Sequence, residues 1–287
     1  MTWVKSMQQA IDYMETNLLE RITIEDIARQ AHVSPFHFQR LFMILTDVSV
    51  GEYLRRRRLT LAAQELTSSN YKIIDLAYKY GYDTPEAFSK AFRKHHGVTP
   101  SEARKGLGKL QSYNRLIIQV NLKGAIPMKY RIEERDEIRV VGVKREIACN
   151  AEGGSPAQGI AEFWAELNRN GTVHRLIQLM DGDIKGPLGV TCNFNEESNT
   201  IEYWIGVEQR GEVPSEFSST ELLPAKWVIF EVNGPVPTAM PKAWKQIYSE
   251  WFPSNGYEPE EQPPFEVYLD SNPMNENAIN EIWIAVK

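Results

Sequence analysis

A single carboxylate stands inside a hydrophobic run near the C-terminus, in the stretch Phe265-Glu266-Val267-Tyr268. Removing an unpaired carboxylate from water is costly, so a glutamate between two apolar residues needs a chemical reason. Aromatic faces attract cations, and a desolvated carboxylate strengthens that attraction, so Glu266 with nearby aromatic rings is typical of a site for a hydrophobic cation. The same residue types also suit proton transfer, with Glu266 as general base and Tyr268 assisting. Both chemistries are open at this point.

A second set of chemically informative residues occurs twice in the N-terminal part. The stretch from Ser34 to Phe42 is repeated at a constant offset of 50 residues from Thr84 to Phe92, with a capping hydroxyl, a proline, two phenylalanines and a cation at the same positions. A hydroxyl followed by proline predicts the first turn of a helix. The phenylalanines, four residues apart, point inward together. The residues left to face water are of types that contact base edges and phosphates: Phe36, Gln39 and Arg40, then Glu86, Ser89 and Lys90.

The elements around these repeats predict two helix-turn-helix units. A short amphipathic run precedes each copy, at residues 23–28 and 73–77. The turn of the second copy is one residue longer, and Gly81 gives it the backbone freedom for a sharp bend. One long helix, over residues 50–66, joins the two units. Residues 1–108 are therefore predicted to form an all-α domain with tandem helix-turn-helix units.

The helical pattern ends after Gly106-Leu107-Gly108, and we expect residues 109–127 to form a linker with an entry strand at 116–120. From residue 128 the order strand, helix, strand, strand occurs twice, which predicts a duplicated α+β domain over 128–287 with its helices on one sheet face. The expected segments are 138–144, 156–170, 188–194 and 201–207, then 226–232, 240–252, 265–270 and 282–286.

Alternation along the strands predicts which side chains share a face. Phe265, Val267 and Leu269 match a core covered by helices, which leaves Glu266 and Tyr268 on the open face. The same argument assigns to the open face three tryptophans, Trp204, Trp227 and Trp283. The sequence thus predicts one concave aromatic surface around a carboxylate, which is typical of a ligand pocket. The alternative is that these tryptophans pack against a loop or against the helical domain.

The N-terminal motifs resemble the DNA-binding domain of the AraC/XylS family, especially its MarA, SoxS and Rob branch. The resemblance covers about residues 5–107 and includes Ser34-Pro35, Gly51-x-Tyr53-Leu54-Arg55, Gly81-Tyr82 and Gly97-Val98-Thr99-Pro100. It implies that both second helices enter the major groove of double-stranded promoter DNA. It assigns base-contacting positions to Phe36, Gln39 and Arg40 in the first helix and to Pro85, Glu86, Ala87 and Lys90 in the second, and His37 is a further candidate. Pro85 and Glu86 replace polar amides of the family, so the second helix is expected to contact phosphate, or Glu86 to accept from a cytosine amino group.

The C-terminal half resembles the GyrI-like effector-binding domain. The resemblance spans about residues 128–287 and is carried by the stretches 202–207, 228–234, 244–251, 265–268 and 281–284. It implies a pocket in which Glu266 attracts a hydrophobic, cationic molecule, as in multidrug sensing, and the two-domain arrangement is Rob-like. Some stand-alone GyrI-like proteins resemble hydrolases of electrophilic molecules. The alternatives to a ligand sensor are therefore a hydrolase and a module that binds or sequesters a protein.

The distribution of charge is consistent with a basic, DNA-binding N-terminal part joined to an acidic C-terminal part of different function. The net charge is −6, but residues 1–112 carry 16 Lys plus Arg against 12 Asp plus Glu, a net +4, whereas residues 113–287 carry 16 against 26, a net −10.

The run Arg55–Arg58 is expected either to contact phosphate or to brace the two helix-turn-helix units. Cys149 and Cys192 lack a metal-ligand spacing and are expected to be buried thiols. No metal or cofactor is expected.

The sequence therefore predicts a transcription regulator and not an enzyme. No 18-residue apolar run and no secretory leader are found, so we expect a cytoplasmic protein without membrane contact. Its expected partners are promoter DNA, RNA polymerase and a small hydrophobic or cationic ligand.

Overall fold

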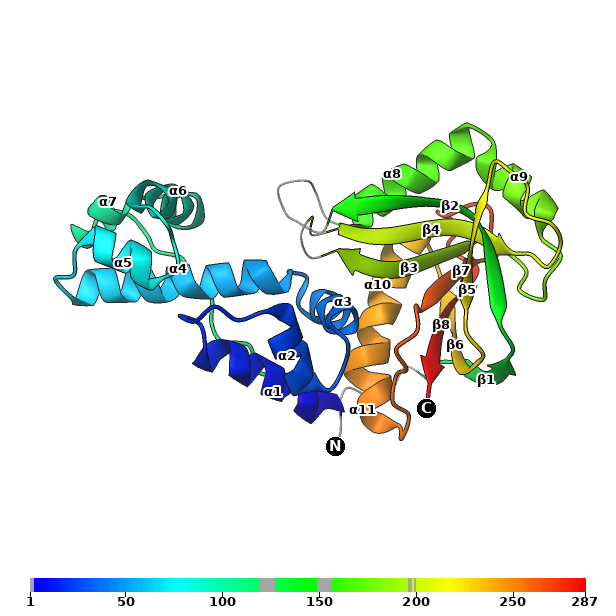
Figure 1. Cartoon of the computed structure of the whole chain (residues 1–287), viewed down its shortest axis with the longest axis horizontal. Coiled ribbons are helices and arrows are strands. Elements are labelled where there is room, and N and C mark those ends of the chain that lie inside the picture. The colour runs from blue at the N-terminus through cyan, green and yellow to red at the C-terminus, as the bar shows by residue number, and fades with distance from the viewer. Residues whose placement is uncertain (1–2, 119–126, 149–155, 196–197, 199) are drawn as a thin grey trace. The chain divides into compact units, whose positions relative to one another are not determined.

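The computed structural model describes residues 3–118, 127–148, 156–195, 198 and 200–287. The chain divides into unit 1, Met1–Gln119, and unit 2, Val120–Lys287. Unit 1 is helical, and unit 2 combines a sheet with helices, as predicted (Figure 1). Within the described ranges, no helix has both the length and the apolar character needed to cross a bilayer.

Unit 1 contains both predicted helix pairs, and each second helix begins at the predicted cap. The Ser34 hydroxyl accepts from His37 N at 3.3 Å, and the Thr84 hydroxyl accepts from Ala87 N at 3.1 Å. The described helices are α1 (Trp3–Thr16), α2 (Ile24–Ala31), α3 (Pro35–Thr46), α4 (Val50–Ser68), α5 (Ile73–Lys79), α6 (Pro85–His96) and α7 (Pro100–Arg104).

The long helix α4 serves both helix-turn-helix units. Near its start Tyr53 packs against Phe42 of α3, with ring centroids 5.5 Å apart. Toward its end Leu66 belongs to the core that contains Phe88 and Phe92 of α6. The α5–α6 turn contains Gly81 at φ +82°, a left-handed conformation that glycine adopts without steric cost.

Residues 109–118 have no regular secondary structure and lie along unit 1. Side chains from α1, α4 and α6 accept hydrogen bonds from the backbone of this segment: His96 from Gln111, Thr60 from Tyr113, Tyr53 from Leu116, and Gln8 from Ile118. The expected strand at 116–120 is absent at 116–118, and its remainder lies outside the described residues. The boundaries of a linker at 109–127 stay a prediction.

Unit 2 contains one antiparallel sheet with strand order β1-β6-β8-β7-β3-β4-β2-β5. The predicted duplication is present as β2-α8-β3-β4 and β6-α10-β7-β8. Its elements are β1 (Tyr130–Arg135), β2 (Ile138–Ala148), α8 (Pro156–Arg169), α9 (Thr172–Leu179), β3 (Leu188–Asn195), β4 (Thr200–Glu208), β5 (Ser218–Leu222), β6 (Ala225–Asn233), α10 (Val236–Gln246), the π-helix η1 (Ile247–Trp251), α11 (Phe252–Ser254), β7 (Phe265–Tyr268) and β8 (Ile279–Val286). The sequence did not predict β1, α9 and β5, and the helix expected at 240–252 begins earlier and includes the π-turn.

The helices cover one face of the sheet, as predicted. Phe163 of α8 belongs to the same core as Tyr203 and Ile205 of β4. In the second module Trp251 of η1 meets Phe230 of β6, with ring centroids 4.9 Å apart. We call this side of the sheet the helix face.

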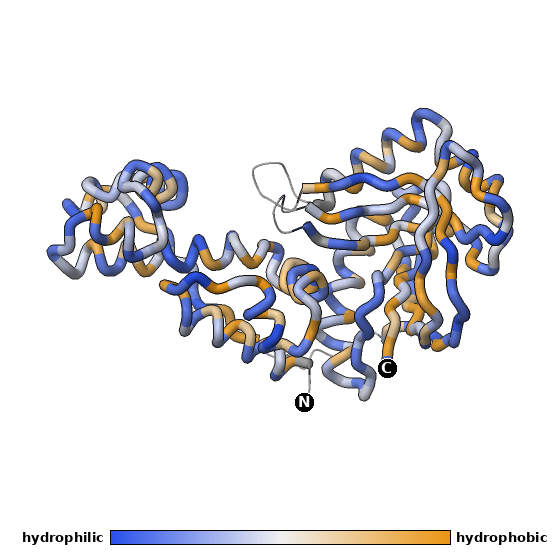
Figure 2. The backbone as a smooth tube through the Cα atoms, viewed as in Figure 1, coloured by the Kyte–Doolittle hydropathy of each residue, from blue (hydrophilic) through white to orange (hydrophobic). Residues whose placement is uncertain are grey.

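The opposite face is also buried, because the sheet curves around it (Figure 1). Every strand from β5 at one edge of the sheet to β6, the neighbour of edge strand β1, contributes to its apolar filling. Orange segments of the tube in Figure 2 mark hydrophobic residues of these strands. We call this filling the inner core; it consists of Ile138, Val140, Ile184, Leu188, Val190, Cys192, Trp204, Leu222, Trp227, Ile229, Phe265, Val267, Trp283 and Ala285. Cys192 is buried there as expected, whereas Cys149 lies outside the described residues.

Candidate functional site

The pairing register of β7 overturns the predicted single aromatic surface. Phe265 pairs with Trp283 of β8, and their rings lie 5.1 Å apart in the inner core. Glu266 pairs with Ile282 on one side and with Gly189 on the other, so Glu266 and Tyr268 belong to the helix face. The assignment of β7 was wrong because alternation separates two sets of side chains but does not tell which set faces the helices.

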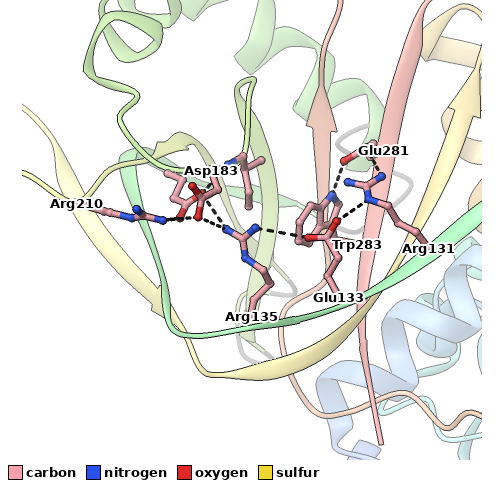
Figure 3. A network of polar contacts seen from close by, with 9 residues as sticks. Arg131, Glu133, Arg135, Asp183, Arg210, Glu281 and Trp283 are labelled. Carbon is pink, nitrogen blue, oxygen red and sulfur yellow. Dashed lines mark hydrogen bonds and ion pairs between the residues drawn. The ribbon is translucent and has the colours of Figure 1, made fainter.

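The three predicted tryptophans are core residues, not the walls of an open pocket. Trp204, Trp227 and Trp283 are 3%, 0% and 2% exposed. Figure 3 shows Trp283 beside Arg131 and Arg135, each with its guanidinium carbon 5.8 Å from a ring centroid of the indole. Lys144 lies similarly over Trp204, at 5.4 Å. The attraction between indole and cation is therefore present on this side, but the chain supplies the cations itself.

A polar cavity of about 480 Å³ lies beside this arginine network. Arg135 and Arg210 both pair with Asp183 (Figure 3). Glu208 accepts from the backbone N–H of Ile184 at 2.7 Å. The cavity is lined by six carboxylate residues and only these two arginines, so it is acidic. No aromatic residue lines it, so it lacks the aromatic character expected of the effector site. No cluster of ligands suited to a metal ion occurs among the residues that the structure describes.

Glu266 lies in a different setting, between aromatic side chains from two modules of the sheet. Trp244 of α10 donates its indole N–H to Glu266 Oε1 at 2.6 Å, and the Tyr268 hydroxyl donates to Oε2. Within the described ranges, Glu266 has no basic side chain as an ion-pair partner. Both donors are neutral, so neither brings a positive charge to this carboxylate in its aromatic surroundings.

Tyr268 links Glu266 to the helix of the other module. Its ring meets Trp164 of α8 edge-on, with centroids 4.8 Å apart. Trp164 Nε1 in turn donates to the Tyr203 hydroxyl at 3.1 Å. Burial, followed by the negative charge of Glu266, raises the pKa of Tyr268 well above its ordinary value, so its hydroxyl remains a donor at physiological pH.

Gly189 of β3 makes room for these rings. A Cβ at this position would lie 2.1 Å from the Tyr203 hydroxyl oxygen and 3.2 Å from Tyr268 Cε2. Its lack of a side chain is therefore required for the two phenols to lie over the junction of β3 and β7. We call Trp164, Tyr203, Trp244, Glu266 and Tyr268 the Glu266 cluster.

Three members of the Glu266 cluster, Trp164, Tyr203 and Trp244, were not predicted as site residues. A sequence signal for Trp244 existed: it is followed by Tyr248 and Phe252 at steps of four, a spacing that places all three on one helix face. Their rings are stacked, with centroids 6.1 Å apart for the first pair and 5.2 Å for the second. No comparable signal connected Trp164 with strand β7.

Helix α6 presents several of its predicted DNA contacts to solvent. Glu86, Ala87 and Lys90 of α6 are exposed, and Pro85 is half-buried. In α3, the predicted contacts Phe36, Gln39 and Arg40 are half-buried.

His37 does not fit the surface role considered for it. It is 4% exposed, and burial lowers its pKa to about 4. Together with Leu41, one turn later, it belongs to the buried side of α3. We therefore omit His37 from the proposed DNA contacts.

The four arginines of α4 make contacts inside unit 1. Arg55 and Arg56 pair with Glu52 of the same helix, and Arg57 pairs with Glu15 of α1 at 2.7 Å. Arg58 donates to the carbonyl oxygens of Leu18 and Glu20, which follow α1. Arg57 and Arg58 thus hold α4 to α1 and to the residues that follow it, and none of these contacts joins the two helix-turn-helix units, so the bracing role stays a prediction.

Comparison with known proteins identifies both units. A family model described as integron-associated effector binding protein matches residues 131–286, which is more than half of the chain. The chain belongs to this family. A helix-turn-helix domain model matches residues 27–106 of the same chain.

Curated relatives match the N-terminal unit. The transcriptional activator AarP of Providencia stuartii is 37% identical over 95 residues, which are 33% of this chain and 70% of AarP. The regulatory protein SoxS of Escherichia coli K12 is 34% identical over 107 residues, which are 37% of this chain and 100% of SoxS. The chain is thus a DNA-binding transcription regulator of the AraC type, with an effector-binding domain after its helix-turn-helix units.

Solved structures match the C-terminal unit. A bacterial transcription regulation protein of Staphylococcus aureus MU50 is 27% identical and has a TM-score of 0.46, with 56% of this chain and 99% of that chain covered. The structure of SAV2435 bound to tetraphenylphosphonium is 25% identical and has a TM-score of 0.49, with 56% and 94% covered.

Proposed function

We propose that the effector-binding domain takes up a hydrophobic cation at Glu266 and that binding changes the activity of the DNA-binding domain. The observation that carries the proposal is the ionic isolation of Glu266: its carboxylate accepts from Trp244 and Tyr268, and no basic side chain among the described residues pairs with it. A cation with apolar substituents would supply the missing positive charge. Its substituents would contact the indole and phenol rings.

The test compares a cation with a neutral molecule of similar shape. Tetraphenylphosphonium and triphenylphosphine oxide are titrated calorimetrically into the full chain and into Glu266→Gln, which keeps the shape of the side chain and removes its charge. We expect the phosphonium to bind the native protein and to lose at least tenfold in affinity, about 1.4 kcal/mol, in the variant. Equal binding of both compounds, or equal binding of the phosphonium to both proteins, contradicts the proposal.

The coupling to DNA is measured with the same ligand. Effector and DNA affinities are linked reciprocally, so phosphonium that alters the DNA affinity must change its own affinity by the same factor when DNA is bound. Fluorescence anisotropy of a binding site selected in vitro, with and without phosphonium, gives this factor. A factor of one, at saturating ligand, contradicts modulation.

We propose no catalytic role for the Glu266 cluster. The raised pKa of Tyr268 keeps its hydroxyl protonated, so it is a hydrogen-bond donor to Glu266 and not a base. An enzyme would convert a neutral electrophile in a manner that depends on Glu266, whereas a binding site for cations leaves such a compound unchanged. Mass spectrometry of epoxide and lactone probes after incubation distinguishes the two.

For unit 1 we propose that α3 and α6 read promoter DNA in the cytoplasm, through Phe36, Gln39 and Arg40 and through Pro85, Glu86, Ala87 and Lys90. RNA polymerase is the proposed protein partner, as for a regulator that acts at promoters. Transcription in vitro from a promoter that contains the selected site tests both: we expect a change in transcript yield that requires the site.

A further inference from the structure

The oxygen atoms of the Glu266 cluster already accept hydrogen bonds from the protein. Glu266 Oε1 accepts from the indole of Trp244 at 2.6 Å, and Oε2 accepts from the Tyr268 hydroxyl. The Tyr203 hydroxyl accepts from the indole of Trp164 at 3.1 Å. Each carboxylate oxygen of Glu266 thus already accepts one hydrogen bond from a neutral donor, so about two of the roughly four lone-pair sites of the carboxylate are in use.

This arrangement treats two kinds of organic cation differently. A primary ammonium carries three N–H donors, and each buried donor left without an acceptor costs binding free energy. A quaternary ammonium or a phosphonium has no donor, so it needs only negative charge and contact with aromatic rings. The Glu266 cluster offers those two things, whereas the roughly two lone-pair sites that Trp244 and Tyr268 leave on the carboxylate are fewer than the three donors of a primary ammonium.

From this geometry we infer that Trp244 and Tyr268 are specificity-determining residues, which favour cations without N–H donors over protonated amines of the same shape. The inference rests on the proposed function, since it concerns ligands of the same carboxylate. Trp244 belongs to α10 and Tyr268 to β7, so the two donors are positioned independently.

The two donors are also well supported in their present positions. Trp244 is 5% exposed and stacks on Tyr248 at 6.1 Å, with ring planes 10° apart. Tyr268 is fixed by its edge contact with Trp164 and by its hydrogen bond to Glu266. A ligand that displaced either donor would have to break these contacts as well, which adds to the penalty for an ammonium.

A matched pair of probes tests the inference on the full chain. Naphthalen-1-ylmethylammonium and its N,N,N-trimethyl derivative share charge and ring system and differ in N–H donors. Calorimetric titration at pH 7 is made with the native protein, Trp244→Phe, Tyr268→Phe and Glu266→Gln. Tyr130→Phe, which removes the hydroxyl of an exposed tyrosine on β1, is the matched control.

We expect the native protein to bind the trimethyl compound at least tenfold more tightly. In Trp244→Phe and in Tyr268→Phe one carboxylate oxygen loses its donor, so the affinity for the primary ammonium should rise and the ratio should fall at least threefold. The control should keep the native ratio. Two separate variants guard against a folding defect in one, and their thermal unfolding is recorded beforehand.

The outcomes separate the inference from the proposed function. If both probes bind the native protein equally and Glu266→Gln weakens both, the cation site stands and the selectivity inference is overturned. The inference is also overturned if the ratio in both donor variants equals the native ratio. If neither probe binds the native protein, or if Glu266→Gln binds them as the native protein does, the proposed function fails and the inference fails with it.

Discussion

Gly189 on β3 lies directly opposite Glu266 on β7, at the junction of the two modules of the sheet. The absence of a side chain at Gly189 leaves the space that the phenols of Tyr203 and Tyr268 fill. The strand pairing thus positions the carboxylate, and the glycine positions the aromatic groups around it.

Gly189→Ala is expected to disturb this arrangement. The added Cβ would meet the Tyr203 hydroxyl at 2.1 Å, so both phenols must move, at a cost in stability of about 1–3 kcal/mol. Urea denaturation measures the loss, and phosphonium titration should show weaker binding in the folded variant. Gly256→Ala is the control, because its Cβ would meet no atom within 4 Å. Equal stability and equal binding of the two variants would contradict the role of Gly189.

The sequence predicted the helices and strands of both units more completely than it predicted which side chains lie on which face of the sheet. Strand alternation correctly separated Glu266 from Phe265 and Trp204 from Tyr203. It could not show which set faces the helices, because Trp227 and Trp283 fill an inner core that exists only when distant strands curve toward each other. Because both faces of the sheet are apolar, polarity along the strands does not indicate which face the helices cover. The error lies in one strand, β7, and it moved Glu266 from one side of the sheet to the other.

The missed site residues have a similar cause. Trp164 and Trp244 were placed in helices correctly, but their contacts with Tyr203 and Glu266 connect positions 39 and 22 residues apart in sequence. Such contacts follow from the way each helix crosses the sheet, which periodicity does not specify. The cap residues Ser34 and Thr84 were predictable because their partners lie three residues away.

The buried pair of Arg57 and Glu15 joins α4 to α1, and its loss should destabilise unit 1. The side chains are 11% and 8% exposed, and Tyr53 also donates to Glu15 at 2.6 Å. Glu15→Gln leaves the guanidinium without its counter-charge, for which we expect a loss of about 3–5 kcal/mol at pH 7. Urea denaturation followed by tryptophan fluorescence or circular dichroism measures it.

The stabilisation by Arg57 and Glu15 should depend on pH. Burial acts to raise the pKa of Glu15, but hydrogen bonds from Arg57 and Tyr53 outweigh it and hold the pKa below the ordinary 4.5. The stabilisation is therefore present above pH 4.5 and is lost as the pH falls through the lower pKa of the folded state. The difference between the native protein and Glu15→Gln should shrink in that acid range. A difference that stays constant down to pH 3 would show that the charge of Glu15 is not involved.

The burial of His95 in α6 should cause a second, distinct dependence of the free energy of unfolding on pH. Burial, then the nearby His96, Arg55 and Arg56, lower the pKa of His95 to about 4. Because the unfolded chain binds the proton near 6.5, unfolding becomes easier as the pH falls from 6.5 toward 4. The slope over this interval should decrease in His95→Gln and remain in His174→Gln, which replaces an exposed histidine of α9. An unchanged slope in His95→Gln would contradict the assignment.

Arg40 of α3 and Lys90 of α6 should affect DNA binding in different ways. An arginine that reads a guanine contributes about 1–3 kcal/mol of discrimination, so Arg40→Ala should weaken binding to a selected site far more than binding to random DNA. A lysine on phosphate contributes equally on any sequence, so Lys90→Ala should weaken both and reduce the slope of log affinity against log salt by about one. Anisotropy titrations between 50 and 200 mM salt give both quantities. If Arg40→Ala lowers the two affinities by the same factor, Arg40 contacts the backbone, and α3 then reads sequence through Phe36 and Gln39 alone.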